Sequence, residues 1–340
     1  MADIYISLFD GLVNDSEAIE MIRQSGIISG IEIYSLLSHF EPIKNAGLKC
    51  AAHDPQVFEM NNLGDPGWLS IFETSRGKKV IELIKCTDSP VVAFHCGFSA
   101  QKVYKMRAYP EAPLVSTLYE NREHLLSTIA RNITGIERLL NQSVNIGSQK
   151  QVLLEPMDFS RSKPVNWQMQ SDEVRAHQTE IEQVFMEYGT NVALQWVSDI
   201  SFFDDLYRRL SNRGEPSSVG FLFDISHVFI TADTKINSGT YSGSIENYFN
   251  ELIDVVKDKI YQIHVNVPEG NPEDGFADAH LPFTKGDALS TRILKLTRQV
   301  IRCSPNLKTI TLEIRGSKNM TPSEFAYLMI EQATVVLNGE

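Results

Sequence analysis

Residues 219–227 read VGFLFDISH: a short apolar run, Val219–Phe223, that ends in Asp224, with His227 three residues further on. An apolar run of this length is typical of a β-strand that is covered on both faces. A carboxylate and an imidazole next to such a strand are costly to bury unless something compensates them. The stretch therefore predicts a parallel strand that delivers polar side chains of the metal-ligand type at its carboxyl end.

Similar runs occur along the whole chain, separated by longer amphipathic stretches. Strands that alternate with helical stretches are typical of a parallel sheet with crossover helices. Eight such units predict the α/β class and a (β/α)8 TIM barrel, with a doubly wound open sheet as the competing architecture. The predicted strands are Ile4–Phe9, Gly30–Tyr34, Leu48–Ala52, Val91–Phe94, Gln151–Leu154, Val219–Phe223, Ile260–Ile263 and Thr309–Leu312.

The chain shows no internal repeat and no Pro/Gly/Ser-rich linker, so we interpret residues 1–340 as one TIM-barrel domain. The clearest helical stretch runs from Leu118 to Leu140. An insertion at about 156–218 holds two predicted helices, Asp172–Tyr188 and Asp199–Leu210. The polar stretch Thr231–Ser244 predicts a long surface loop.

Charge and composition restrict the partners. The 340 residues include 43 acids and 31 bases, for a net charge of −12, so nucleic acid and anionic membranes are repelled at long range. No apolar run approaches the roughly 18 residues of a membrane span, and the first residues lack the basic region of a signal peptide. The four cysteines form no CxxC pair, which favours a reducing compartment. We expect a cytoplasmic protein without a membrane partner; its oligomeric state stays open.

The residues that follow the other predicted strands repeat the pattern of Asp224 and His227. In a parallel barrel the carboxyl ends of the strands converge on one face. Each strand from the third to the eighth contributes an imidazole or a carboxylate there, and a further pair follows the seventh strand in a predicted loop. The predicted metal ligands are His53, His95, Glu155, Asp224, His227, His264, Asp278, His280 and Glu313.

Imidazole and carboxylate together suit zinc, iron or manganese, and the lack of cysteine at these positions argues against a structural zinc site. Nine ligands exceed the needs of one ion, so their convergence predicts two or three divalent ions that share bridging carboxylates. Singly, Asp224 or Asp278 could merely cap a helix or a loop. Glu32 could hydrogen-bond to a ligand or cap the next helix. The other histidines, predicted to lie at the surface, are His39, His124 and His177.

This ordered set resembles the metal-ligand signature of the xylose-isomerase-like barrel superfamily, and in particular that of endonuclease IV. The resemblance runs from His53 to Glu313, and residues 52–95 are also similar in layout to the third and fourth units of that family. It implies three zinc ions, a bridging role for Glu155, and Glu313 as the group that orients or deprotonates the attacking water. The implied ligand sets are His53, His95 and Glu155; Glu155, Asp224, His264 and Glu313; and His227, Asp278 and His280.

Two departures keep other activities open. Asp54-Pro55-Gln56 stands where endonuclease IV resemblance predicts a tyrosine, and the segment between Glu155 and Asp224 is longer than in that family. The multinuclear non-haem iron oxidases that modify peptides share the barrel and much of the ligand order, with Asn expected at His227. A sugar or sugar-phosphate isomerase or epimerase, in which Glu155 and Glu313 move protons, is the other alternative.

Basic side chains follow the ligand-bearing strands although the chain is acidic overall. Arginine suits bidentate phosphate contacts, and Tyr104, Tyr109 and Trp167 lie near these bases in the sequence. We therefore expect an anionic small-molecule or nucleotide-like substrate and favour metal-dependent hydrolysis of a phosphoester, with Zn²⁺ ahead of Fe or Mn²⁺; a peptide is the alternative substrate. The predicted substrate-binding residues are Lys102, Lys105, Arg107, Arg161, Lys163, Arg315 and Lys318.

Overall fold

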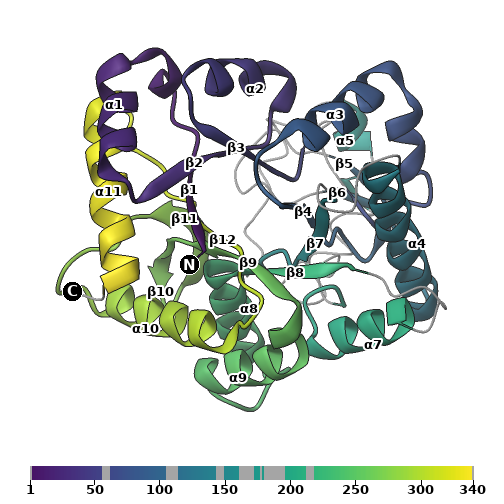
Figure 1. Ribbon diagram of the computed structural model, residues 1–340. Coiled ribbons are helices and arrows are strands. Elements are labelled where there is room, and N and C mark those ends of the chain that lie inside the picture. The colour runs from purple at the N-terminus through teal and green to yellow at the C-terminus, as the bar shows by residue number, and fades with distance from the viewer. Residues whose placement is uncertain are drawn as a thin grey trace.

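Eight parallel strands close into a barrel in the computed structural model, which describes residues 2–55, 62–104, 114–142, 149–160, 172–176, 178–179, 196–211 and 218–338 (Figure 1). Neighbouring strands pair in the order β1-β12-β9-β8-β7-β4-β3-β2. The predicted α/β TIM barrel is therefore confirmed, and the open sheet is wrong. The strands are β1 (Asp3–Ser7), β2 (Ile28–Ile33), β3 (Lys49–His53), β4 (Val91–His95), β7 (Gln151–Glu155), β8 (Gly220–Asp224), β9 (Ile260–Val265) and β12 (Thr309–Leu312).

Helices surround the barrel and bury their apolar faces against the outer faces of the strands (Figure 1). In α9, Ser244 accepts a hydrogen bond from the N–H of Asn247 at the first turn, and Phe249, Leu252 and Val256 recur at helical spacing on the buried side. None of the described helices is long and apolar enough to cross a membrane. The helices are α1 (Ser16–Ser25), α2 (Leu36–Asn45), α3 (Ser75–Cys86), α4 (Arg122–Asn141), α5 (Asp172–Ala176), α7 (Ile200–Ser211), α8 (Ile225–Asn237), α9 (Ile245–Val256), α10 (Ala288–Cys303) and α11 (Pro322–Asn338).

Two antiparallel hairpins extend from the barrel. One joins β5 (Ala100–Tyr104) to β6 (Leu114–Leu118), and the other joins β10 (Val267–Asn271) to β11 (Gly275–Leu281). The loop predicted for Asp278 and His280 is wrong, because both residues lie in β11, which pairs with β10. The predicted helix from Leu118 starts later, at Arg122, because β6 includes Leu118 and the side chain of Asn121 caps α4.

The polar stretch Thr231–Ser244 is only partly a loop. Its first half belongs to α8, where Thr231, Thr234 and Lys235 are buried. Distant partners satisfy these polar groups: Thr231 Oγ1 accepts a hydrogen bond from the N–H of Phe159, and Lys235 forms an ion pair with Asp199. Of the helices predicted in the insertion, Asp199–Leu210 is confirmed as α7. Only the start of the other lies in a described helix, α5, and most of the remainder is outside the described residues.

Side chains alternate between the two faces of each strand, and this alternation determines which residues point into the barrel. Val91, Ala93, Leu153 and Leu222 pack together as an apolar cluster separate from the main core, inside the barrel. Two residues beyond Ala93, Leu153 and Leu222 the same inward face presents His95, Glu155 and Asp224. The strand register pairs His95 with Glu155 and Asp224 with His264. The last interior layer at the carboxyl end of the barrel therefore consists of imidazoles and carboxylates.

Candidate metal centre

The structure brings all nine predicted ligands together at the carboxyl end of the barrel, and all except His95 and Asp278 are buried. Glu155, which is fully buried, lies at the middle of the cluster. Its Oε1 is 3.5 Å from His227 Nδ1 and 3.7 Å from His264 Nδ1, and its Oε2 is 3.5 Å from His95 Nε2 and contacts His53 Nε2. One carboxylate thus contacts four imidazoles from four different parts of the chain.

Four overlapping groups have ligand atoms within 4.8 Å of one another: Glu32, His53 and His264; His53, His95 and Glu155; Glu155, Asp224 and His227; and Asp224, His264 and Glu313. The second group has the members of the first ligand set that the resemblance implies, and the fourth has three of the four residues of the second set. In the third set, Asp278 Oδ2 is 2.6 Å from His280 Nε2 and 3.6 Å from His227 Nε2. The binding of ions to these groups stays a prediction.

Four of the five imidazoles have one ring nitrogen against an acceptor other than Glu155. His95 Nδ1 lies 3.0 Å from Asp54 Oδ2, and His264 Nε2 lies 2.8 Å from Glu32 Oε1. His227 Nδ1 is 3.0 Å from the carbonyl of Pro156, and His280 Nδ1 is 2.8 Å from that of Glu313. In a neutral ring, a proton held at that nitrogen would leave the other nitrogen free to bind a metal ion, and this is how proteins orient histidine ligands.

Several buried atoms of the cluster have no hydrogen-bond partner among the described residues: Glu155 Oε1, Asp224 Oδ2, Asp278 Oδ1 and His53 Nδ1. Buried polar atoms are nearly always hydrogen-bonded, and a buried carboxylate oxygen without a donor is costly. Divalent cations compensate such oxygens, and the donor set of imidazole and carboxylate suits zinc, iron and manganese. The residues therefore fit the two or three ions that the sequence predicts.

The charged groups of the cluster shift one another's pKa values. Burial favours the neutral form of Glu155, but His53 and His95 lower its pKa to about 2. Burial opposes charge on His95, yet Glu155 and Asp54 raise its pKa to about 9. Burial raises the pKa of Asp224 to about 6, against the effect of His227. Protons on the imidazoles thus balance the carboxylates, and metal ions have to displace those protons in order to bind.

Two residues of the site have a left-handed backbone: Asp54 with a φ of 38° and His280 with a φ of 53°, the only such residues besides glycine in the described part of the chain. Left-handed backbone at non-glycine residues is uncommon, costs free energy and is concentrated at functional sites. Hydrogen bonds stabilise both: Asp54 N–H donates to the carbonyl of Ala93, and Arg315 N–H donates to that of His280. The strained conformations position Asp54 against His95 and His280 against Asp278.

The sequence did not identify Asp54, Tyr34 or Gln262 as part of the site. Tyr34 donates a hydrogen bond to Glu313 Oε1, and Gln262 donates one to Glu32 Oε2. For Glu32, the interpretation as a hydrogen-bonding partner of a ligand is confirmed, because it contacts His264. Glu32 and Gln262 could have been found from the alternation of side chains along the strands, in which every second residue faces the same side. Gln262 precedes His264 by two residues, and Glu32 points into the same barrel interior.

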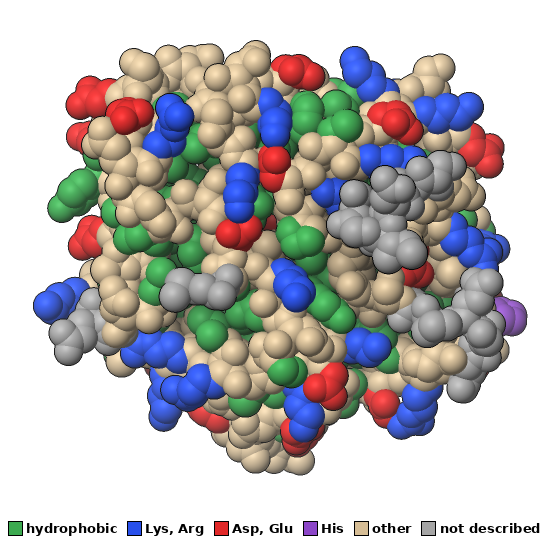
Figure 2. All heavy atoms as spheres, in the orientation of Figure 1, with side chains coloured by type: hydrophobic (Ala, Val, Ile, Leu, Met, Phe, Trp, Pro, Cys, Tyr) green, Lys and Arg blue, Asp and Glu red, His purple; other side chains and the backbone are tan. Residues whose placement is uncertain are grey.

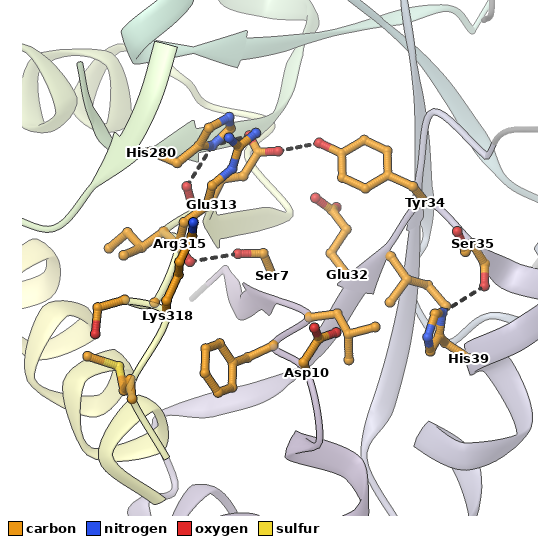
Figure 3. A pocket seen from close by; sticks show the side chains of 17 residues that line it. Ser7, Asp10, Glu32, Tyr34, Ser35, His39, His280, Glu313, Arg315 and Lys318 are labelled. Carbon is orange, nitrogen blue, oxygen red and sulfur yellow. Dashed lines mark hydrogen bonds and ion pairs between the residues drawn. The ribbon is translucent and has the colours of Figure 1, made fainter. Parts of the chain in front are cut away.

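A cavity of about 720 Å³ opens beside the cluster and is lined by residues at and beyond the carboxyl ends of β1, β2 and β12, together with His280 of β11 (Figure 3). Glu313 and His280 lie on one side of it, Tyr34 lies opposite, and Glu32 lies between them (Figure 3). The polar side chains that line it include Ser7, Asp10, Glu32, Tyr34, Ser35, His39, His280, Glu313, Arg315, Ser317 and Lys318.

Two of the seven predicted substrate-binding residues, Arg315 and Lys318, line this cavity as exposed side chains. Lys102 lies on β5, but its side chain is outside the described part of the chain. The others also lie outside it: Lys105, Arg107, Arg161 and Lys163.

Among the remaining histidines, His124 is exposed as predicted and His177 is outside the described residues. His39 also lies at the surface, where it is half-buried: its Nδ1 is 3.2 Å from the carbonyl of Ser35, and it lines the cavity.

Neither a protein-family model nor a curated protein sequence matches the chain. Solved structures do match over almost its whole length. A putative xylose isomerase from Rhodospirillum rubrum has a TM-score of 0.58 at 11% identity and covers 99% of this chain and 98% of its own. A xylose isomerase domain containing protein from Salmonella typhimurium has a TM-score of 0.53 at 9% identity, with coverage of 99% and 97%. A xylose isomerase-like TIM barrel protein from Mycobacterium smegmatis, in complex with magnesium, has a TM-score of 0.51 at 10% identity, with coverage of 99% and 98%.

These likenesses define a class of fold. The chain has a TIM barrel similar to those of these proteins, and buried His, Glu and Asp clusters lie at its carboxyl end. At such low identity the matches carry the fold and no activity. The narrower resemblance to endonuclease IV stays a prediction from the ligand order.

Proposed function

We propose that the protein is a metal-dependent enzyme that interconverts isomers or epimers of a small sugar or sugar phosphate. The observation that carries this proposal is the cavity of about 720 Å³ that Glu313 shares with hydroxyl, carboxylate and cationic side chains. Ser7, Ser35 and Asp10 are suited to hydrogen bonds with sugar hydroxyls, and Arg315 is suited to a phosphate. The volume suits a small molecule rather than a duplex.

Glu313 is the residue that can transfer a proton in this cavity. Burial favours its neutral form, but His280 and His264 hold its pKa well below the usual range, so the carboxylate is ionised. Its Oε1 accepts a hydrogen bond from Tyr34, and its Oε2 is 3.0 Å from His264 Nδ1. Held in this way, Glu313 can take a proton from a carbon next to a substrate carbonyl and return it to a neighbouring position or to the other face.

The groups that would hold divalent ions are the four overlapping ligand groups, two of which include Glu155. An ion bound there supplies Lewis acidity that polarises the substrate carbonyl and makes the adjacent C–H bond more acidic. Arg315 and Lys318 would bind the anionic end of the substrate at the opening of the cavity. Tyr34 would keep the carboxylate of Glu313 turned toward the bound sugar.

The test is deuterium exchange in heavy water, followed by NMR, with metal-reloaded protein and a panel of aldoses, ketoses and their phosphates. We expect metal-dependent incorporation at the carbon next to the carbonyl, lost in Glu313→Gln. Arg315→Ala should weaken turnover of the phosphorylated substrates only, whereas Arg208→Ala, at an exposed arginine of α7, should change neither. No incorporation from any substrate by fully metallated protein would contradict the proposal, as would full activity of Glu313→Gln.

A second candidate is phosphoester hydrolysis, which the overlap of the four ligand groups favours. Those groups offer more donors than one ion needs, and clusters of two or more ions activate water and stabilise both oxygens of an in-line displacement. Metal-dependent cleavage of an abasic-site duplex or of a small phosphoester, without deuterium exchange, would support it. Iron in the purified protein and oxygen consumption with a peptide would instead support the oxidase alternative.

A further inference from the structure

A second, cationic groove lies on the outside of the barrel between α10 and α11. One cavity of about 840 Å³ is lined by both helices and by residues 283–286, and a neighbouring cavity of about 580 Å³ continues toward the end of α11. Arg298 and Arg302 line both cavities. The groove is therefore continuous across these two arginines, and it is separate from the cavity beside Glu313.

The charge of the groove is opposite to that of the protein. Five cations line its two cavities against one acid, Glu331, whereas the chain as a whole carries −12. Figure 2 shows Lys and Arg side chains gathered at the lower left of the molecule, where Figure 1 places α10. The five cations are Lys285, Lys295, Arg298, Arg302 and Lys308.

These cations differ from the other arginine of α10. Arg292 forms an ion pair with Glu246 of α9 at 2.8 Å, whereas none of the five forms an ion pair with a described residue. Arg298 only donates a hydrogen bond of 3.3 Å to the carbonyl of Val335. Cations that no ion pair neutralises raise the local concentration of an anionic partner and its rate of association.

Apolar side chains flank the cations on both sides. Leu294, Ile330 and Val335 line the first cavity, together with Tyr327, whose side chain is 65% exposed. In the second cavity Leu307 and Leu337 continue the apolar lining, and Leu337 is also among the exposed large hydrophobic residues. A single phosphate group would fill only the middle of such a groove, whereas an extended chain could contact the cations and both apolar ends.

Hydrogen bonds join the groove to a residue close in sequence to the metal centre. The side chain of Gln332 on α11 is buried and forms hydrogen bonds with both the N–H and the carbonyl of Phe283, which lies three residues after His280. From this charge and apolar pattern we propose that the α10–α11 groove binds an acidic peptide segment that carries large apolar side chains. A protein partner bound there would contact residues 283–286, which follow the strand that presents Asp278 and His280.

The experiment uses the whole, metal-loaded protein and a fluorescent peptide of about eight residues composed of Asp, Glu and Leu, with fluorescence anisotropy as the readout. We expect saturable binding that weakens as salt increases, because the contacts are electrostatic and exposed. A peptide in which Lys replaces the acids should not bind. An acidic peptide with Ser in place of Leu should bind more weakly.

Variants locate the binding. Lys295→Glu with Arg302→Glu should weaken it more than about tenfold, and Tyr327→Ser should weaken it less. Lys78→Glu with Lys79→Glu, on the exposed face of α3, makes the same change in net charge and should leave it unchanged. Metal content and activity of all three variants should match those of the parent protein.

Four results would overturn the inference. The first three are no saturable binding at millimolar peptide, equal weakening by the α3 variant, and displacement of the peptide by inorganic tripolyphosphate alone at the same charge concentration. A change in oligomeric state caused by Lys295→Glu with Arg302→Glu would also overturn it, since the groove would then be covered by a second copy of the chain.

Discussion

Buried charged groups at the two ends of the barrel differ in their hydrogen-bond partners. At the amino end, Lys150 is buried, and its Nζ donates hydrogen bonds of 2.6 Å to the carbonyls of Thr87 and Ser89. Asp88 nearby accepts from the N–H of Cys50 and pairs with Lys44. At the carboxyl end, Glu155, Asp224 and Asp278 each keep one carboxylate oxygen without a hydrogen-bond donor among the described residues.

This difference indicates that the amino end of the barrel contributes to stability and the carboxyl end to function. At the amino end, Lys150 and Asp88 each contact several partners, as expected for the face of a TIM barrel that contributes stability. Incomplete sets of partners at the carboxyl end leave ligand atoms available for ions, at a cost that the rest of the fold has to offset. Changes at the two ends should therefore affect different measured quantities.

The largest effect is expected for Glu155→Gln, because one amide cannot replace the carboxylate that contacts four imidazoles. Metal content after reloading, measured by elemental analysis, should fall, and activity should fall by more than about 100-fold, the usual upper figure for loss of a supporting residue. Glu41→Gln, at an exposed position of α2, serves as the control. Normal metal content in Glu155→Gln would contradict the assignment of ion binding to the carboxyl end of the barrel.

A smaller effect is expected for Glu32→Gln, which keeps the shape of the side chain but no longer holds a proton on His264 Nε2 as a carboxylate does. Loss of such a partner costs about 10–100-fold in metal affinity or activity. Competition with a chromogenic chelator measures the affinity. An affinity equal to that of the parent protein would show that Glu32 does not orient His264.

At the amino end, Lys150→Met should lower the free energy of unfolding by about 1.5–3 kcal/mol, because two buried carbonyls lose a charged donor. Metal content should not change. Lys49→Met removes a half-exposed ion pair with Asp3 and should cost less than about 1 kcal/mol. Urea unfolding gives both values, and loss of metal from Lys150→Met would show that the two ends are coupled.

The last prediction concerns the pH dependence of the metal-free protein. The pKa values of His95 and His280 are raised to about 9 from 6.5, so their stabilising contribution is complete below pH 6.5 and is lost as the pH rises through 9. The thermal midpoint of chelated protein should therefore fall between pH 6.5 and 9, and His95→Gln should reduce the slope. A midpoint that rises over this range would mean that these imidazoles are not paired with the carboxylates.

The sequence predicted the barrel and its ligand layer because both depend on local patterns. His53, His95, Glu155 and Asp224 each end an apolar run, and parallel strands of similar length bring such ends to one level. Asp54 was missed because its role depends on a left-handed backbone that its residue type does not require.

The rest of the fold depends on contacts that are distant in sequence. The polar residues of α8 were interpreted as a loop because the groups that satisfy them, the N–H of Phe159 and the carboxylate of Asp199, are far away along the chain. The α10–α11 groove was missed for the same reason: its cations come from separate segments that only the folded chain brings together.

The most direct test is the number of divalent ions bound per chain after the purified protein is stripped with chelator and reloaded, measured by elemental analysis alongside an unfolding curve. A shared centre around Glu155 predicts two or more ions per folded chain and a higher unfolding temperature when they are bound. A folded protein that holds less than one ion per chain in excess zinc, iron, manganese or magnesium would contradict it.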